Sequence, residues 1–468
     1  MAEELIWLTA AELTVGYERG DFTPVEVAEA TYARIEAVDG KINAFRTLDR
    51  DVAMAAATAS TERWRNGSPL SAIDGVTATI KDLFSFAGHD NRKGSLTTPD
   101  SIDAADAPAV ARLRDAGAVL LGKTTTPEFG WKGVTDSPLT GITRNPWNLD
   151  TTPGGSSGGA SAAAAAGMGV LNLGTDGGGS IRIPAGFAGV FGHKPSFGRV
   201  PYAPPSAMGT LAHAGPLTRT VMDSVLMLNV MMGITPEDWY TQPSEPIGLA
   251  GLSAGVEGLR IAYSPDLGYA TVDAEVADAV NRAAKQFADL GATVVEADPG
   301  LDDPIAMFNV LWQSGAHGAL RNLPDSEKAK LDPGLQKVLV AAEDISLGDY
   351  MDAMAARAAY SASMLGFMQE FDLLLTPSLA VPAFGAGRLV PEGWSEDQDN
   401  SWVAWTPFSY PFNLTQQPAC SVPCGFTAGG LPVGLQIVGR MFDDTTVLRA
   451  AQAYETANPV TRNHRPSL

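Results

Sequence analysis

The sequence is short of the residue types that build metal sites and disulfide scaffolds. Its 468 residues include two cysteines and five histidines. Cys420 and Cys424 have no second pair of ligands nearby, and the sequence contains no H-E-x-x-H motif and no cluster of histidines with carboxylates. We therefore expect no metal, no cofactor and no disulfide framework, and two thiols in a chain of this size favour a reducing compartment.

Basic charge and long apolar runs are also scarce. The chain has 32 lysines and arginines against 53 aspartates and glutamates, which gives a net charge of −21. Nucleic acid and anionic membranes both require a basic surface, so we expect neither as a partner. The longest uncharged run, residues 158–174, is short and glycine-rich for a membrane span, and we expect a buried helix there. The first residues carry acid where a signal peptide needs base, so we expect a cytoplasmic protein.

What the sequence does contain is the alternation of helical and strand patterns that is typical of an α/β domain. Residues 23–26 form a capping box that predicts a helix to about residue 36. The pattern also predicts a strand ending at Lys81, a β-α-β unit over residues 259–295 and a loop over residues 193–205. Without internal repeats or a long linker, these elements predict one α/β domain with helices on both faces of the sheet.

Glycine is concentrated between residues 153 and 198, in two loops at residues 154–159 and 174–184. Glycine at this density indicates backbone that takes positive φ or lies very close to another group. The first loop formally matches G-x-S-x-G, the nucleophile elbow of α/β-hydrolases, but His317 and His464 alone follow at a useful distance and neither has a triad-like context. The glycines also lack the lysine and spacing of a phosphate-binding loop.

Serine chemistry without histidine fits these loops better. Ser180 follows three glycines, and such a turn can direct several N–H groups at one developing oxyanion. A serine needs a base, and a buried lysine serves because burial favours its neutral form. Lys81, at the end of an apolar strand, is the best placed candidate, with Ser156 or Ser157 as a relay. Spacing alone does not prove that these groups meet.

The two loops resemble the signature of the amidase signature family of serine hydrolases. They read G-G-S-S-G-G at residues 154–159 and G-T-D-x-G-G-S-I-R-x-P at residues 174–184, and the resemblance continues at residues 81–82, 191–195 and 430–436. It implies an amidase that cleaves amide C–N bonds without a cofactor, on a central mixed β-sheet covered on both faces by helices. It also implies a catalytic triad of Ser180 as nucleophile, Ser156 after a cis peptide bond as relay, and Lys81 as base.

The resemblance implies further roles by position. The N–H groups of the second loop are expected to form the oxyanion hole, at Gly177, Gly178, Gly179 and Ser180. Structural support is expected from Ser157, Asp176 and Arg182. One wall of the substrate pocket is expected at Phe129, Gly130 and Trp131, and the aromatic segment 394–410 is a candidate for the other. Position 177 is commonly threonine in this family, and here it is glycine.

These aromatic residues favour a neutral, apolar or aryl substrate, either an amide or an ester or carbamate (urethane). Two alternatives remain open: the glutaminase subunit of a tRNA-dependent amidotransferase, whose loop usually reads S-I-R-Q-P, and a non-catalytic binding member of the family. We expect a monomer or homodimer that uses a small amide and water.

Residues 1–468 are expected to form one amidase domain, with a helical N-terminal layer (1–65), a catalytic core (66–230), a mostly helical region with one β-α-β unit (231–370) and a C-terminal part of the core (371–468).

Overall fold

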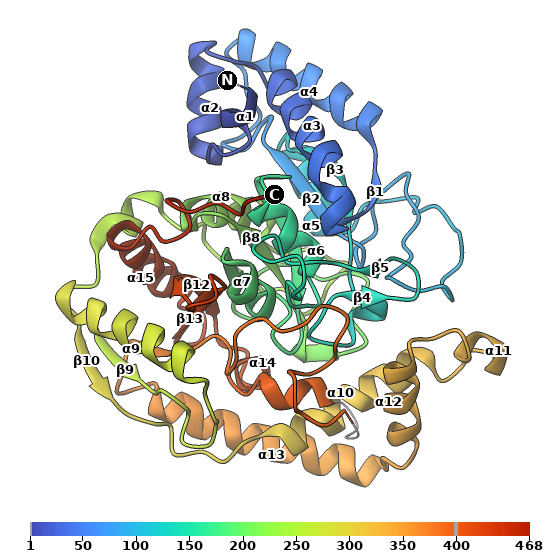
Figure 1. Cartoon of the computed structure of the whole chain (residues 1–468), viewed down its shortest axis with the longest axis vertical. Coiled ribbons are helices and arrows are strands. Elements are labelled where there is room, and N and C mark those ends of the chain that lie inside the picture. Colours follow the sequence, from blue (N-terminus) through green and yellow to red (C-terminus); the bar gives the residue numbers. More distant parts are fainter. Residues whose placement is uncertain (1, 397–400) are drawn as a thin grey trace.

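The computed structural model describes residues 2–396 and 401–468, and its centre is a mixed β-sheet (Figure 1). In the described part of the chain this sheet has eleven strands, in the order β1 (Phe45–Leu48), β3 (Val119–Thr124), β2 (Thr77–Lys81), β6 (Leu171–Asp176), β8 (His213–Thr218), β7 (Phe191–Lys194), β12 (Ala419–Phe426), β13 (Pro432–Gly439), β11 (Leu373–Pro377), β9 (Arg260–Tyr263) and β10 (Thr293–Glu296). Strands β3, β2 and β6 are parallel, as are β11, β9 and β10, and the strands between these two groups pair antiparallel. A second sheet pairs β4 (Asp136–Ser137) with β5 (Gly141–Ile142).

Helices cover both faces of the large sheet, as the sequence predicts. The helices are α1 (Ala2–Leu5), α2 (Ala10–Arg19), α3 (Pro24–Ile42), α4 (Arg50–Arg65), α5 (Pro108–Asp115), α6 (Gly158–Ala165), α7 (Arg182–Ala188), α8 (Val221–Met231), α9 (Ala274–Asp289), α10 (Ile305–Leu320), α11 (Asp325–Lys328), α12 (Pro333–Glu343), α13 (Leu347–Phe367), α14 (Pro411–Leu414) and α15 (Asp444–Ala457). Helices α1–α4 lie at one end of the molecule, and α10–α13 form a layer at the other end (Figure 1). The one-domain α/β prediction is confirmed.

Local sequence signals explain where several elements begin and end. Thr23 and Glu26 form the predicted capping box, with Pro24 in the first turn of α3. The helix continues past residue 36 to Ile42, and Asn43 ends it in the left-handed conformation. The β-α-β unit of β9, α9 and β10 lies where the sequence predicts it.

Two predictions in the glycine-rich region are only partly correct. The run 158–174 is not one helix: α6 ends after eight residues, Gly167 and Gly169 take positive φ, and the chain then enters β6. The expected loop 193–205 begins inside a strand, because His193 and Lys194 pair with Cys420 and Ala419 of β12. Both errors have one cause, since buried central strands lack the alternating pattern that identifies half-exposed strands.

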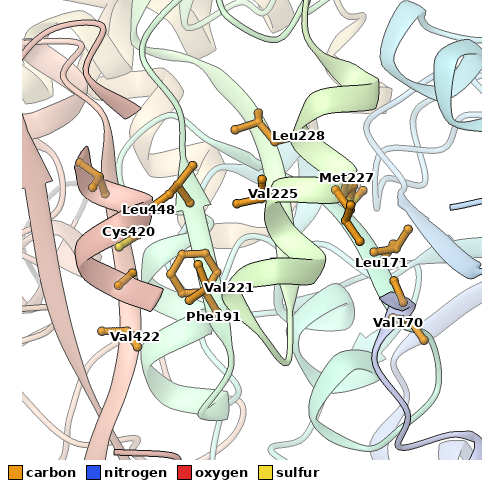
Figure 2. Packing of buried hydrophobic residues seen from close by; sticks show 14 of the residues in the cluster. Val170, Leu171, Phe191, Val221, Val225, Met227, Leu228, Cys420, Val422 and Leu448 are labelled. Carbon is orange, nitrogen blue, oxygen red and sulfur yellow. The ribbon is translucent and has the colours of Figure 1, made fainter. Parts of the chain in front are cut away.

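The largest cluster of buried apolar residues packs α8 and α15 against the antiparallel part of the sheet. Figure 2 shows side chains of α8 lying beside those of β7, β12 and α15, among them Val221, Val225, Leu228, Phe191, Cys420, Val422 and Leu448. On the opposite face α7 packs close to β12, where Gly186 lies beside Ser421. The sheet is therefore buried on both sides around the segment that carries the two glycine-rich loops.

Within residues 2–396 and 401–468, the structure has no helix with the length and apolar character that a membrane crossing requires.

Candidate active site

Neighbouring parallel strands bring the predicted base to the glycine-rich loops. Strand β2 pairs with β6 in parallel, with Ile80 opposite Leu173, and β2 ends at Lys81 while β6 ends at Asp176. Parallel strands present their carboxyl ends at the same edge of a sheet. The first glycine-rich loop reaches this edge as well, because it leads into α6, which packs on β6 and β2.

Lys81 lies at the centre of three hydroxyl groups. Its Nζ is 2.7 Å from Ser156 Oγ, 2.9 Å from Ser157 Oγ and 2.8 Å from Thr175 Oγ1. The lysine is completely buried. Burial lowers the pKa of Lys81 well below its usual value, and the Asp176 carboxylate opposes this shift in part. The surroundings therefore favour the neutral amine, which can accept a proton.

Ser156 and Ser180 are brought together by the backbone. The Gly155–Ser156 peptide bond is cis, as the resemblance implies. The next residue, Ser157, donates its N–H to the carbonyl oxygen of Ser180 at 3.2 Å. Only 3% of Ser180 and 1% of Ser156 are exposed. Among the described residues no hydrogen bond joins the hydroxyls of Ser156 and Ser180, so the structure connects Lys81 to Ser156 directly and holds Ser180 next to Ser157 through the backbone.

The second loop has backbone N–H groups that carry no hydrogen bond to any described residue. The N–H groups of Gly177, Gly178 and Ser180 donate no hydrogen bond to any acceptor in the described part of the chain. The N–H of Gly179 differs, because it donates to Asp176 Oδ1 at 2.8 Å. Three of the four amides predicted for an oxyanion hole are thus free, and the fourth holds the loop in shape.

Asp176 and Arg182 form the buried ion pair behind this loop. Arg182 Nη2 lies 2.9 Å from Asp176 Oδ1, and both side chains are fully buried. Arg182 also donates to Ser409 O, Gln436 Oε1 and Asn413 Oδ1. Although burial alone would raise it, Arg182 holds the pKa of Asp176 far below its usual value. The ion pair therefore holds the second loop in place from its buried side.

The sequence matches the Amidase family over residues 26–448. The chain belongs to the amidase signature family.

Relatives and solved structures agree with this membership over nearly the whole chain. An acylamidase of Rhodococcus erythropolis is 38% identical over 466 residues, covering 98% of this chain and 97% of the relative. The crystal structure of a bacterial aryl acylamidase of the amidase signature family superposes with a TM-score of 0.90 at 31% identity, covering 98% of this chain and 99% of that one. A glutamyl-tRNA(Gln) amidotransferase subunit of Myxococcus xanthus (strain DK1622) is 35% identical, covering 99% of this chain and 100% of the relative. The chain is thus an amide C–N hydrolase by family.

The predicted pocket wall of this amidase divides into two parts. Phe129 and Gly130 both take positive φ, and the backbone here lies close to Ser156: a Cβ on Gly130 would lie 3.2 Å from Ser156 Oγ. The Trp131 ring extends instead to α12, where a Cβ on Gly334 would lie 2.5 Å from its Cη2. Gly130 therefore borders Ser156, and the Trp131 side chain packs against a neighbouring helix.

Three aromatic residues cover the second loop, and two of them are not singled out by the sequence. A Cβ on Gly177 would lie 3.0 Å from Trp312 Cζ3, and one on Gly178 would lie 2.8 Å from Phe308 Cζ and 3.1 Å from Trp402 Cη2. Trp402 comes from the predicted aromatic segment 394–410, of which residues 397–400 lie outside the described residues. Trp312 and Phe308 belong to α10, far along the chain from either loop.

Thr175 is a further site residue that the sequence prediction does not include, although its position inside the second motif is a usable signal. Trp312 and Phe308 give no such signal, because an aromatic residue on a helix is most simply interpreted as core. The described residues also contain no group of three histidine, cysteine or carboxylate side chains arranged to hold a metal ion.

Proposed function

We propose that this amidase hydrolyses neutral amides with an apolar or aryl group, and the corresponding esters and carbamates, through an acyl-enzyme on Ser180. The observation that carries the proposal is the contact of the buried Lys81 Nζ with Ser156 Oγ at 2.7 Å. A lysine surrounded by hydroxyls can be neutral, because each hydroxyl can donate as well as accept. This arrangement supports Lys81 as base and Ser156 as relay.

In the first half-reaction, Ser180 Oγ attacks the substrate carbonyl carbon. Ser156 Oγ takes the proton of Ser180 as its own proton passes to Lys81 Nζ. The free N–H groups of Gly177, Gly178 and Ser180 donate to the oxyanion in this scheme, and preorganised donors stabilise such charge strongly in a buried site. The proton then returns from Lys81 through Ser156 to the leaving nitrogen, and the C–N bond breaks to release the amine.

In the second half-reaction, water replaces the amine. The same relay removes a proton from the water as it attacks the ester on Ser180, and returns a proton to Ser180 Oγ when the acid leaves. Every step moves protons between groups of the chain, water and substrate, so the reaction needs no cofactor.

The aromatic surroundings support the choice of substrate. Trp131, Trp312, Trp402, Phe308 and Leu311 belong to one buried apolar cluster next to the loops. Sites lined in this way favour apolar groups with a few fixed polar contacts. The similarity to an acylamidase and an aryl acylamidase supports the same class.

The test is a substrate panel with an adduct measurement. We expect turnover of acyl anilides and aryl carbamates, and a single covalent adduct of an alkyl fluorophosphonate that peptide mass spectrometry places on Ser180. No adduct on Ser180 in an active preparation would overturn the proposed nucleophile.

The similarity to the amidotransferase of Myxococcus xanthus supports a second candidate, a glutaminase that works with partner subunits. Ile183 stands where that enzyme's loop usually has glutamine, which favours the first proposal. Turnover of glutamine with inert anilides would select the second. No turnover of any of these substrates or of glutamine by the folded wild type, with no fluorophosphonate adduct on Ser180, would instead support the non-catalytic binding role. We propose that the chain acts in the cytoplasm as a monomer or homodimer. Light scattering of the purified protein tests the oligomeric state.

A further inference from the structure

Three aromatic rings lie directly on the glycines of the second loop. Trp312 covers Gly177 at 3.0 Å, and Phe308 and Trp402 cover Gly178 at 2.8 and 3.1 Å, measured from the Cβ position that each glycine leaves empty. A Cβ contact of 3.0 Å is closer than ordinary van der Waals packing allows. The Trp312 ring therefore occupies the space that a side chain at position 177 would take.

Trp312 is held firmly in this position. Its Nε1 donates to the carbonyl oxygen of Trp131 at 3.2 Å. The ring stacks on Phe308 with centroids 5.4 Å apart and meets Trp402 edge to face at 5.6 Å. Only 2% of Trp312 is exposed. A residue with one hydrogen bond and two ring contacts makes a rigid wall rather than a movable one.

This wall offers no charge to a substrate. The residues packed around Trp312 in the described part of the chain form an apolar cluster. The nearby carboxylate of Asp303 accepts the hydroxyl of Tyr410 at 2.6 Å, and Tyr410 packs on Phe308. Burying an unpaired ammonium or carboxylate against such a surface is very unfavourable. An acyl group that lies against these rings would therefore have to be uncharged.

A carbonyl oxygen bound by the N–H groups of Gly177 and Gly178 lies about 3 Å from them. Its acyl substituent then meets the rings that cover the same two glycines. We propose that Trp312 is the residue that sets the size of the acyl group, limiting it to short or flat uncharged chains. This inference rests on the proposed function. It adds that the enzyme selects its substrates by their acyl group rather than by their leaving group.

The experiment compares the wild type with Trp312→Ala on p-nitroanilides of acetic, butyric, hexanoic and octanoic acids. We expect the ratio of kcat/KM for hexanoyl over acetyl to rise at least tenfold in the variant. The p-nitrophenyl esters of the same acids share the acyl group, so they should show the same shift. Acetanilides that vary only in the leaving group should keep their relative rates within twofold.

Trp239→Ala is the matched control, because Trp239 is 83% exposed and lies outside the described site. It should keep the wild-type acyl profile. An unchanged hexanoyl to acetyl ratio in Trp312→Ala, or a shift confined to the leaving-group series, would overturn the inference.

A second variant keeps the test decisive if Trp312→Ala does not fold. Gly177→Ala places a methyl group against the Trp312 ring, which must then shift. If the ring shifts into the space of the acyl group, kcat/KM should fall more for butyryl than for acetyl substrates. Trp312→Phe in the same chain should restore the butyryl rate, because a smaller ring gives the methyl group room. A double variant no better than Gly177→Ala would contradict the proposed contact.

The two proposals fail in different ways. If the wild type cleaves none of the anilides or esters and Ser180 takes no fluorophosphonate, the proposed function is wrong. If the wild type is active and Trp312→Ala keeps the wild-type profile, the function stands and only the role of Trp312 is lost.

Discussion

Two buried lysines on one sheet, Lys81 and Lys194, have opposite surroundings. Both are completely inaccessible to solvent, and each is the last residue of its strand. Lys81 contacts three hydroxyls. Lys194 donates to the carbonyl oxygens of Pro195 and Gln417 and lies 3.4 Å from Nε2 of His213. Burial lowers the pKa of both lysines, that of Lys194 to about 7.

The difference lies in what the partners can do when the amine loses its charge. A carbonyl oxygen only accepts hydrogen bonds, so it favours the protonated lysine. A hydroxyl can turn and donate to the neutral amine. The comparison therefore predicts that Lys81 acts as a base and that Lys194 supports the fold behind Asp176, whose carboxylate acts on both lysines.

The largest expected effect comes from the nucleophile itself. Ser180→Ala should lower kcat/KM on a cleaved anilide by about 10⁴-fold or more, because no other group can form the acyl-enzyme. Steady-state kinetics measures the loss, and a circular dichroism spectrum like that of the wild type controls for folding. Residual activity within tenfold of the wild type would place the nucleophile elsewhere.

The lysine comparison is tested directly by replacing each lysine with methionine. Lys81→Met should lower kcat/KM by about 10³-fold, because the relay loses its base. Lys194→Met should lower the thermal midpoint while keeping kcat/KM within about tenfold of the wild type, since it removes the structural hydrogen bonds to Pro195 and Gln417. Equal losses of activity in two well-folded variants would remove the distinction between the lysines.

Asp176→Asn sharpens the comparison because it changes the charge next to both lysines. The variant leaves Arg182 buried without its carboxylate, which should cost about 3 kcal/mol of unfolding free energy, as measured with urea. It should also lower the pKa of Lys81 further, since Asp176 is the charge that raises it. An unfolding free energy equal to that of the wild type would show that the pair is not needed for stability.

The pH dependence should follow Lys81. Its protonated form cannot accept a proton, so kcat/KM should fall as the pH is lowered through the depressed pKa of Lys81 and stay high above it. In Asp176→Asn the fall should begin at a lower pH. Lys194→Met should leave the pH at which kcat/KM falls unchanged. A shift of this pH in Lys194→Met, and not in Asp176→Asn, would contradict the assignment of Lys81 as the base.

The smallest effect is expected for the third hydroxyl around Lys81. Thr175→Val removes one hydrogen bond of about 1 kcal/mol from Nζ, so kcat/KM should fall about fivefold. Thr175→Ser keeps the hydroxyl and should recover the wild-type rate. A Val variant as active as the wild type would show that two hydroxyls are enough to hold Lys81.

The sequence predicts the fold class and the family better than it predicts the central strands and the aromatic residues around the glycine-rich loops. The capping box at Thr23 and the β-α-β unit are local signals, and the paired glycine loops identify the family because their spacing is specific. Strands β6, β7 and β8 are not evident from the sequence, since their residues are buried on both faces and show no alternation. Trp312 is not evident either, because its contact with Gly177 joins segments that nothing in the sequence connects.

The pairing of β2 with β6 has a consequence for how this protein becomes active. Lys81 reaches Ser156 and Thr175 only when two strands separated by about 90 residues have docked in register. Such long-range pairing forms late and slowly in folding, because the intervening chain must first be ordered. Catalytic activity therefore requires the docking of β2 on β6, and turnover during refolding should not recover before this part of the β structure has returned.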